Sequence, residues 1–177
     1  MRNFYLFFFL LLIVFKSNAQ TSIYHPFPES NATWNVLWDG GFFSGCLESF
    51  SYNISGDTVI STITYQKIEV PYILNLGVCS PFHSTGYNGC IREDTSTRKV
   101  YYLAPDSTNE ELLYDFSLQV GDSAQGSLRF NCFTPTLAVL QIDSILIGTN
   151  YRKRWTIGNA FPSNHIIEGI GIVAAMS

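Results

Sequence analysis

The carboxylate side chains are the first candidates for chemistry in this sequence. Glu93-Asp94 and Glu110-Glu111 are adjacent pairs, and glycoside hydrolysis needs two carboxyl groups placed about one bond. Neighbouring residues on a strand point to opposite faces of the sheet, so neither pair is expected to flank a substrate. Folding could still pair carboxylates that stand alone beside apolar residues, namely Asp39, Glu48, Glu69 and Glu168. The sequence therefore assigns no catalytic residue.

Metal and cofactor patterns are missing from the sequence. His25, His83 and His165 are spread along the chain without the spacing of metal ligands, and surface or turn positions explain them more simply. Residues 106–110 (Asp-Ser-Thr-Asn-Glu) offer oxygen ligands for Ca²⁺ but lack the spacing and the glycine of an EF-hand. The GxSxG, phosphate-loop, HExxH and GxGxxG motifs do not occur. We therefore expect no metal and no cofactor.

One basic cluster, Tyr-Arg-Lys-Arg-Trp at residues 151–155, is a candidate for binding. On a strand, Arg152 and Arg154 share one face, whereas Trp155 lies on the other face. A protective edge strand is the simpler interpretation, and a site for an acidic glycan or peptide is the alternative. Trp155, Arg152 and Arg154 are the candidate binding residues, although aromatic side chains in a small β domain more often belong to the core.

The first 19 residues have the pattern of an export signal. Arg2 gives a positive start, residues 4–15 form an apolar run, and Ser17-Asn18-Ala19 supplies small residues before a cleavage site. A spanning helix needs about 20 apolar residues, and Lys16 ends this run earlier. We expect a signal peptide at 1–19, a mature chain that starts at Gln20, and no transmembrane segment after cleavage. The mature protein is then secreted or at the cell surface, or periplasmic if no sorting tail exists.

Export makes the cysteines interpretable. Four cysteines form an even set without a CxxC pair, and disulfides are expected in an oxidising compartment. The residues between Cys79 and Cys90 are rich in turn formers, so this pair is preferred, and Cys46 with Cys132 follows by elimination. The other connectivities remain open.

Composition excludes two broad classes of protein. The chain has 177 residues, of which 46% are hydrophobic, 15% aromatic and 14% charged, with a formal net charge of -4. That apolar content excludes a disordered chain. The acidic balance argues against nucleic acid or anionic lipid as a partner, because each requires a basic surface.

The remaining pattern is that of an all-β protein. Short alternating segments are interrupted by Gly, Asp, Asn, Ser and Pro, as in an antiparallel meander. Helix signals are confined to Ser107–Leu113. With no repeat or linker, residues 20–177 are expected to form a single domain, built as a β-barrel or a β-sandwich. We predict hairpins over residues 51–68 (with its turn at Ser55-Gly56-Asp57), 88–103 and 136–157.

Several segments of the chain, taken in their order along the sequence, resemble those of a large uncharacterised group of secreted bacterial β proteins. Members of that group commonly carry a C-terminal type IX secretion (type A) sorting domain, and the resemblance covers about residues 34–172. It ends before the sorting domain into which such proteins usually continue. The segments are residues 87–94, 99–102, 111–122, 143–145, 151–155 and 167–171.

The resemblance implies export and a β fold but supplies no activity, so no catalytic residue is carried over. We therefore expect a non-enzymatic β domain that serves as a binding or accessory module, with a glycan or protein at the cell surface as its partner. The alternative is a secreted hydrolase of glycan or peptide that uses a carboxylate pair assembled by the fold. A concave pocket with convergent Asp or Glu side chains would favour the enzyme.

Overall fold

A computed structural model describes residues 23–40, 45–77, 82–124, 137–158 and 164–174 of the chain. The expected signal peptide and its cleavage site lie outside these residues. So do Cys79 and Cys132. Within the described residues, no helix is long and apolar enough to cross a membrane.

The described residues form antiparallel β structure, which confirms the all-β prediction. The segment with helix signals, Ser107–Leu113, is not helical: its residues from Glu111 onward, where polar and apolar residues alternate, belong to a strand. The strands are β1 (Thr33–Asp39), β2 (Leu47–Ile60), β3 (Ile63–Val70), β4 (Ile73–Asn75), β5 (Gly86–Asp94), β6 (Lys99–Leu103), β7 (Glu111–Asp115), β8 (Val139–Ile147), β9 (Asn150–Ile157), β10 (Asn164–Ile167) and β11 (Gly171–Ala174).

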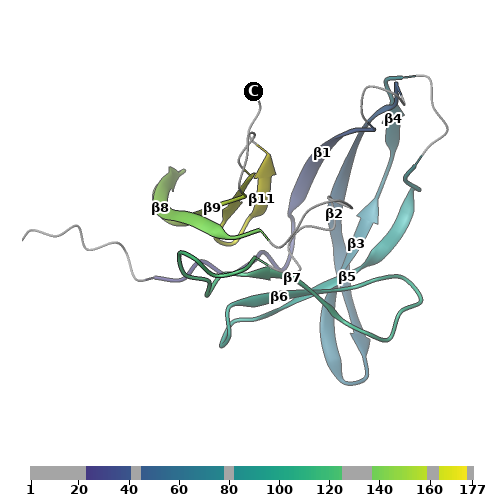
Figure 1. The fold of residues 1–177 in the computed structure, drawn as a ribbon. Helices are drawn as coiled ribbons and strands as arrows, with labels where there is room; N and C mark the ends of the chain where they lie inside the picture. The colour runs from purple at the N-terminus through teal and green to yellow at the C-terminus, as the bar shows by residue number, and fades with distance from the viewer. Residues whose placement is uncertain (1–22, 41–44, 78–81, 125–136, 159–163, 175–177) are drawn as a thin grey trace, which may run out of the picture.

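The strands form one large sheet and one small sheet. The large sheet has the order β1-β2-β3-β5-β6-β7, and β4 pairs with the first half of β2. It curls, so that β6 and β7 run across the lower end of β2, β3 and β5 (Figure 1). The small sheet has the order β11-β10-β9-β8 and contains the predicted hairpin of β8 and β9.

The first hairpin turns later than the sequence predicts. We expected a turn at Ser55-Gly56-Asp57, but β2 continues through these residues to Ile60. The register with β3 shifts between Ile54 and Asp57, so a β-bulge in β2 absorbs one extra residue. The chain reverses instead at Ser61 and Thr62, whose φ angles of 48° and 73° lie in the left-handed region that tight hairpin turns require.

Both sheets contribute to one hydrophobic core. Ile68, Ile91 and Val100 come from the large sheet, whereas Trp155 and Ile166 come from the small sheet, and all belong to the same buried cluster. Burial of apolar surface between the sheets is the main favourable contribution to their packing. The two sheets therefore pack against each other through this cluster.

Candidate functional site

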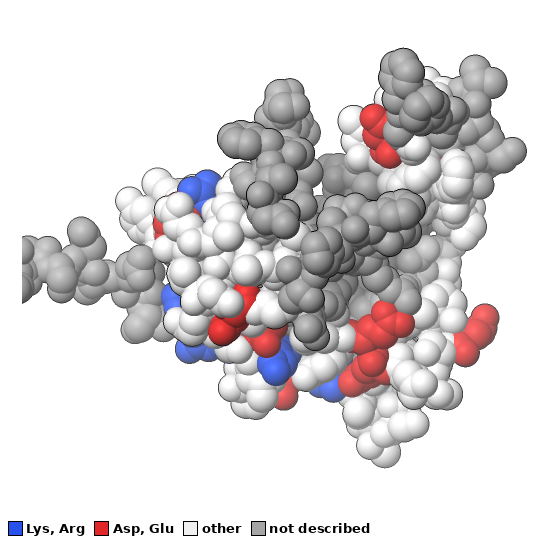
Figure 2. Space-filling view, viewed as in Figure 1, with Lys and Arg blue, Asp and Glu red and all other residues white. Residues whose placement is uncertain are grey.

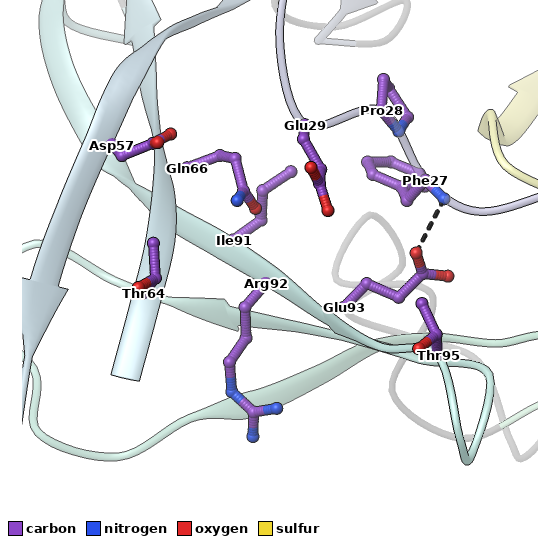
Figure 3. A pocket seen from close by; sticks show the side chains of 10 residues that line it. All are labelled: Phe27, Pro28, Glu29, Asp57, Thr64, Gln66, Ile91, Arg92, Glu93 and Thr95. Carbon is purple, nitrogen blue, oxygen red and sulfur yellow. Dashed lines mark hydrogen bonds between the residues drawn. The ribbon is translucent and has the colours of Figure 1, made fainter. Parts of the chain in front are cut away.

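The candidate site is a cavity of about 270 Å³ between the start of the described chain and the face of β2, β3 and β5 (Figure 3). Phe27, Pro28 and Glu29 form one wall. The residues that line the opposite wall and the rim are Asp57, Thr64, Gln66, Ile91, Arg92, Glu93 and Thr95.

Strand register explains how the floor of the cavity is built. Asp57 on β2 is the cross-strand partner of Gln66 on β3, and Gln66 is the partner of Ile91 on β5. Partners in register share a face of the sheet, and residues two apart on a strand share a face as well. Thr64 and Glu93 therefore extend the same row along β3 and β5, as the close view shows (Figure 3).

The wall opposite the sheet is a stretch of chain without strand structure, which we call the N-terminal strap (residues 24–29). Both oxygens of Glu93 hold it: the Tyr24 hydroxyl donates to Oε1, and the Phe27 amide donates to Oε2 at 2.9 Å. Burial raises the pKa of Glu93, and the charge of Glu29 adds to this effect, while the two hydrogen bonds oppose it. Glu93 is therefore a half-buried carboxyl group that is already engaged by the strap.

The positive charge of Arg92 does not compensate the carboxylates that line the cavity. Its Nη2 donates to Glu110 Oε2 at 2.6 Å, and its Nε donates to the other oxygen of that carboxylate. The Arg92 side chain points away from Glu29 (Figure 3), and its charged group lies over the Tyr101 ring, 4.4 Å from the centroid. The hydrogen bond from Arg92 lowers the pKa of Glu110. The two charges compensate each other outside the cavity.

The polar groups that remain available are acidic or neutral. Among the described residues, no side-chain hydrogen bond engages Glu29, Asp57, Gln66 or Thr64. The cavity therefore combines two uncommitted carboxylates, an amide and a hydroxyl with the apolar surface of Phe27 and Ile91. Such a lining accepts hydrogen bonds from hydroxyl or ammonium groups and repels anions.

No protein-family model, curated protein or solved structure matches this chain. The resemblance to secreted type IX proteins thus stays a prediction, and the site has to be interpreted from its own geometry.

A second cluster joins one of the lone carboxylates to a histidine. Glu48 is fully buried, and it accepts hydrogen bonds from His83 Nδ1 at 2.5 Å and from the Phe82 amide at 2.8 Å. The hydrogen bond from His83 lowers the pKa of Glu48. Trp38 and Phe50 pack against the imidazole, at centroid distances of 5.4 Å and 4.6 Å.

A carboxylate that orients an imidazole is part of a catalytic triad when a nucleophile completes it. Within the described part of the chain, no hydroxyl or thiol is hydrogen-bonded to His83. His83 was interpreted as a simple loop residue, and the structure instead shows it tied to a buried carboxylate. Here the pair anchors residues 82 and 83 onto the face of β1 and β2.

The basic cluster at residues 151–155 does not present its three candidate binding residues on an open surface. Trp155 is 1% exposed, and its indole donates to the Leu118 carbonyl at 3.0 Å. Arg154 is paired with Asp143 at 2.8 Å and 2.5 Å. Arg152 donates to the Glu168 carbonyl at 3.0 Å. The predicted alternation is right, but the Trp155 face packs into the core, so Trp155 cannot stack on a ligand.

The other carboxylates are not brought together as a catalytic pair among the described residues. Asp94 accepts hydrogen bonds from Ser96 and Thr97 in the β5–β6 turn, which lower its pKa to about 2. Glu168 is buried and lies close enough to Tyr24 for its charge to help raise the pKa of that phenol. Neither carboxylate lines the cavity.

The alternatives of a calcium loop at 106–110 and of histidine metal ligands find no support among the described residues. Glu110, in the loop at 106–110, accepts hydrogen bonds from Arg92 and Tyr65. In the described ranges, no three His, Cys, Asp or Glu side chains are grouped to hold a metal ion. His25 contacts the Tyr151 carbonyl at 3.1 Å, and His165 contacts the Thr156 hydroxyl at 3.3 Å.

Cys90 corrects the disulfide prediction. It is a free thiol and fully buried, and burial raises its pKa. Its position in the middle of β5 packs it with Tyr65 and Leu103, so the side chain faces the interior and not a loop. The predicted Cys79–Cys90 pairing is therefore wrong. The pairing of Cys46 with Cys132 involves a residue outside the described part of the chain.

Sequence analysis missed the residues that line the cavity floor. Asp57 was assigned to a turn, and Thr64 and Gln66 were not singled out within the predicted hairpin over residues 51–68. The alternation of polar residues along β3 was a usable signal, because a polar row next to a buried row marks the exposed side of a half-buried sheet. The position of Asp57 depends on the bulge in β2, which has no simple local signature.

Proposed function

We propose that the protein is a non-enzymatic binding module and that the cavity takes the end of a glycan with hydroxyl or ammonium groups. The uncommitted carboxylates of Glu29 and Asp57, beside the amide of Gln66, carry this proposal. Carboxylate and amide oxygens accept hydrogen bonds from sugar hydroxyls, while Phe27 and Ile91 supply apolar surface for a ring. The size of the cavity suits a single sugar unit.

Charge supports a neutral or cationic ligand over an anionic one. Arg92 is the basic residue among those lining the cavity, and its charge is compensated by Glu110. Acidic side chains also cover more of the face toward the viewer in Figure 2 than basic ones do. An anionic sugar would meet repulsion from Glu29 and Asp57, whereas an ammonium group would be attracted.

Three carboxylates line the cavity, as the hydrolase alternative requires, but the contacts that Glu93 makes favour binding over hydrolysis. A general acid needs a carboxyl group with a raised pKa that reaches the leaving group. Burial raises the pKa of Glu93, but its oxygens accept hydrogen bonds from Tyr24 and from the Phe27 amide. This carboxyl group therefore supports the wall of the cavity.

A charge series of monosaccharides tests the proposal. Titration calorimetry or NMR should show glucosamine binding more tightly than glucose, and glucuronate not binding. Asp57→Asn and Glu29→Gln should each weaken glucosamine binding about tenfold, because each removes a charged acceptor. Glu69→Gln is the matched control, since Glu69 is an exposed carboxylate on β3 outside the cavity. Equal affinities for the three sugars, or no binding, would contradict the proposal.

The second candidate is a hydrolase that uses Glu93 as its acid. The raised pKa of Glu93, with Glu29 in the same cavity, is the observation that favours it. Turnover of aryl glycosides by purified protein, lost in Glu93→Gln and retained in Glu69→Gln, would replace binding by hydrolysis.

We also propose that the protein is exported to the cell surface or the medium. The support is the signal-peptide pattern of residues 1–19 and the resemblance to secreted type IX proteins. A surface location would bring the cavity into contact with extracellular glycans. Intact-mass measurement on exported protein should give a chain that begins at Gln20, and a retained Met1 would contradict this.

A further inference from the structure

The N-terminal strap crosses between the two sheets without joining either as a strand. Its Tyr24 ring packs on Phe116, with centroids 6.3 Å apart, and the His25 imidazole donates to the Tyr151 carbonyl of β9 at 3.1 Å. Phe27 is buried in the shared core. The strap is thus held by side-chain contacts and a few hydrogen bonds, whereas the strands are held by continuous ladders.

The backbone of the strap lies directly against Gly169, in the turn between β10 and β11. A Cβ atom added at Gly169 would lie 2.7 Å from the carbonyl oxygens of His25 and Pro26, and 2.5 Å from Arg152 Nη1. Real Cβ atoms do not approach backbone oxygens so closely. Gly169 also has a φ angle of 67°, which other residues rarely adopt. The absence of a side chain at this position is therefore what lets the strap approach.

We propose that the cavity is a conditional site, which is complete only when the N-terminal strap is docked against Gly169, and that ligand binding and strap docking are coupled. This inference rests on the proposed binding function. Phe27, Pro28 and Glu29 contribute one wall, and the strands contribute the other. A ligand that touches both walls binds the docked state alone, so it stabilises docking, and docking strengthens binding by the same factor.

The strap has the properties of a segment that opens locally. Asn31, with a φ angle of 54°, lies in the bend between the strap and β1. Phe27 in the core, the Tyr24 ring packed on Phe116 and the Glu93 contacts hold the strap. Among the described residues, no ladder of backbone hydrogen bonds joins it to a strand, so its opening requires less free energy than global unfolding. When it opens, Glu93 loses both donors and the cavity loses the wall that carries Glu29.

The test compares two glycines that have the same backbone strain. Gly148 has a φ angle of 61° and no atom within 4 Å of an added Cβ, whereas Gly169 at 67° has the strap against it. Hydrogen exchange measured by mass spectrometry should show about tenfold faster exchange of the peptide covering 23–30 in Gly169→Ala, with β2 and β3 unchanged. Gly148→Ala should exchange like the wild type in this peptide.

Tyr24→Phe provides a second variant in case Gly169→Ala does not fold. It removes the hydroxyl that donates to Glu93 and keeps the ring against Phe116. It should accelerate exchange of the same peptide by a smaller factor. Unchanged exchange of the strap in both variants would overturn the proposal.

The coupling is measured with glucosamine as the probe. Saturating glucosamine should slow strap exchange in the wild type and in Gly148→Ala, and Gly169→Ala should bind it about tenfold more weakly. Equal affinity of Gly169→Ala and the wild type would overturn the coupling. If the wild type binds no sugar, the proposed function fails, and the exchange comparison still decides whether Gly169 controls docking.

Discussion

The Phe27 ring stacks on the Trp34 indole, with centroids 5.3 Å apart and planes 11° from parallel. The same indole donates a hydrogen bond from Nε1 to the Ile170 carbonyl at 2.9 Å. Trp34 lies on β1, Phe27 on the N-terminal strap, and Ile170 in the turn of the small sheet. One side chain therefore connects the three parts of the molecule that meet around the strap.

Phe27→Ala should be strongly destabilising. Phe27 is 7% exposed and packs on Trp34 and Tyr114, so its truncation removes buried apolar surface and leaves a void. The free energy of unfolding should fall by about 3 kcal/mol in denaturant titrations. Ile23→Ala is the control, because Ile23 is 69% exposed and should change stability by less than about 0.5 kcal/mol. Equal effects of the two variants would show that the Phe27 contacts contribute little.

The fold class was accessible from the sequence because its signals are local. Alternation along β7 and β9 and the turn residues between strands predicted an antiparallel meander, and the hairpin of β8 and β9 is confirmed. The turn at Gly56 was wrong for a reason that is not local. Gly56, with a φ angle of 99°, lies in the bulge of β2 instead of a turn. The pairing of β2 with β3 decides where the chain reverses.

The candidate site could be predicted only in part. Alternation correctly separated Trp155 from Arg152 and Arg154, but it cannot tell which face of a strand becomes buried. That choice follows from packing of the small sheet on the large one. Glu48 and His83 are 35 residues apart, and Tyr24 and Glu93 are 69 apart. Contacts at such separations depend on topology, which residue types and spacing do not reveal.

Replacement of Glu93 should alter the pH dependence of stability without removing any hydrolytic activity. Burial raises the pKa of Glu93. The folded protein then binds more protons than the unfolded chain in the window above the ordinary carboxyl pKa, so stability falls as the pH rises through this window. Glu93→Gln should flatten that slope in the window above the ordinary carboxyl pKa, as measured by denaturant titrations at a series of pH values.

The Glu69→Gln variant should keep the wild-type slope, since that carboxylate is exposed. Joint replacement of Glu93 and Asp94 by Ala should lower stability further, because the strap loses its acceptor and the β5–β6 turn loses the hydrogen bonds to Ser96. A panel of polysaccharides and peptides should show no turnover by any of these proteins. Activity that disappears with Glu93 alone would argue for the hydrolase.

Cys90 should be unreactive in the folded protein and reactive after unfolding. The thiol has no exposed surface, so an alkylating reagent cannot reach it. Burial also raises its pKa, so it stays protonated and is not the reactive thiolate. Alkylation without reductant, followed by peptide mass mapping, should label Cys90 in denaturant and leave it unmodified in native buffer. Recovery of Cys90 in a disulfide-linked peptide would contradict the structure.

The buried Glu48 should determine how the protein responds to acid. The hydrogen bond from His83 and the Phe82 amide favour the ionised carboxylate and lower its pKa. The contribution of Glu48 to stability is therefore present above the pKa of the unfolded chain and is lost as the pH falls through the lower pKa of the folded protein. Because Trp38 packs against His83, its fluorescence should report the loss of this contact.

His83→Gln should move the acid transition to higher pH. The variant removes the imidazole that stabilises the Glu48 carboxylate, so the carboxyl group is protonated sooner on acidification and leaves the Phe82 amide without a charged acceptor. Acid titration followed by Trp fluorescence and near-ultraviolet circular dichroism measures the midpoint. Asp57→Asn serves as the control, since Asp57 has no side-chain hydrogen bond among the described residues, and its midpoint should equal that of the wild type. If His83→Gln also leaves the midpoint unchanged, the imidazole does not lower the pKa of Glu48. Residues 82 and 83 are then anchored by the aromatic contacts alone.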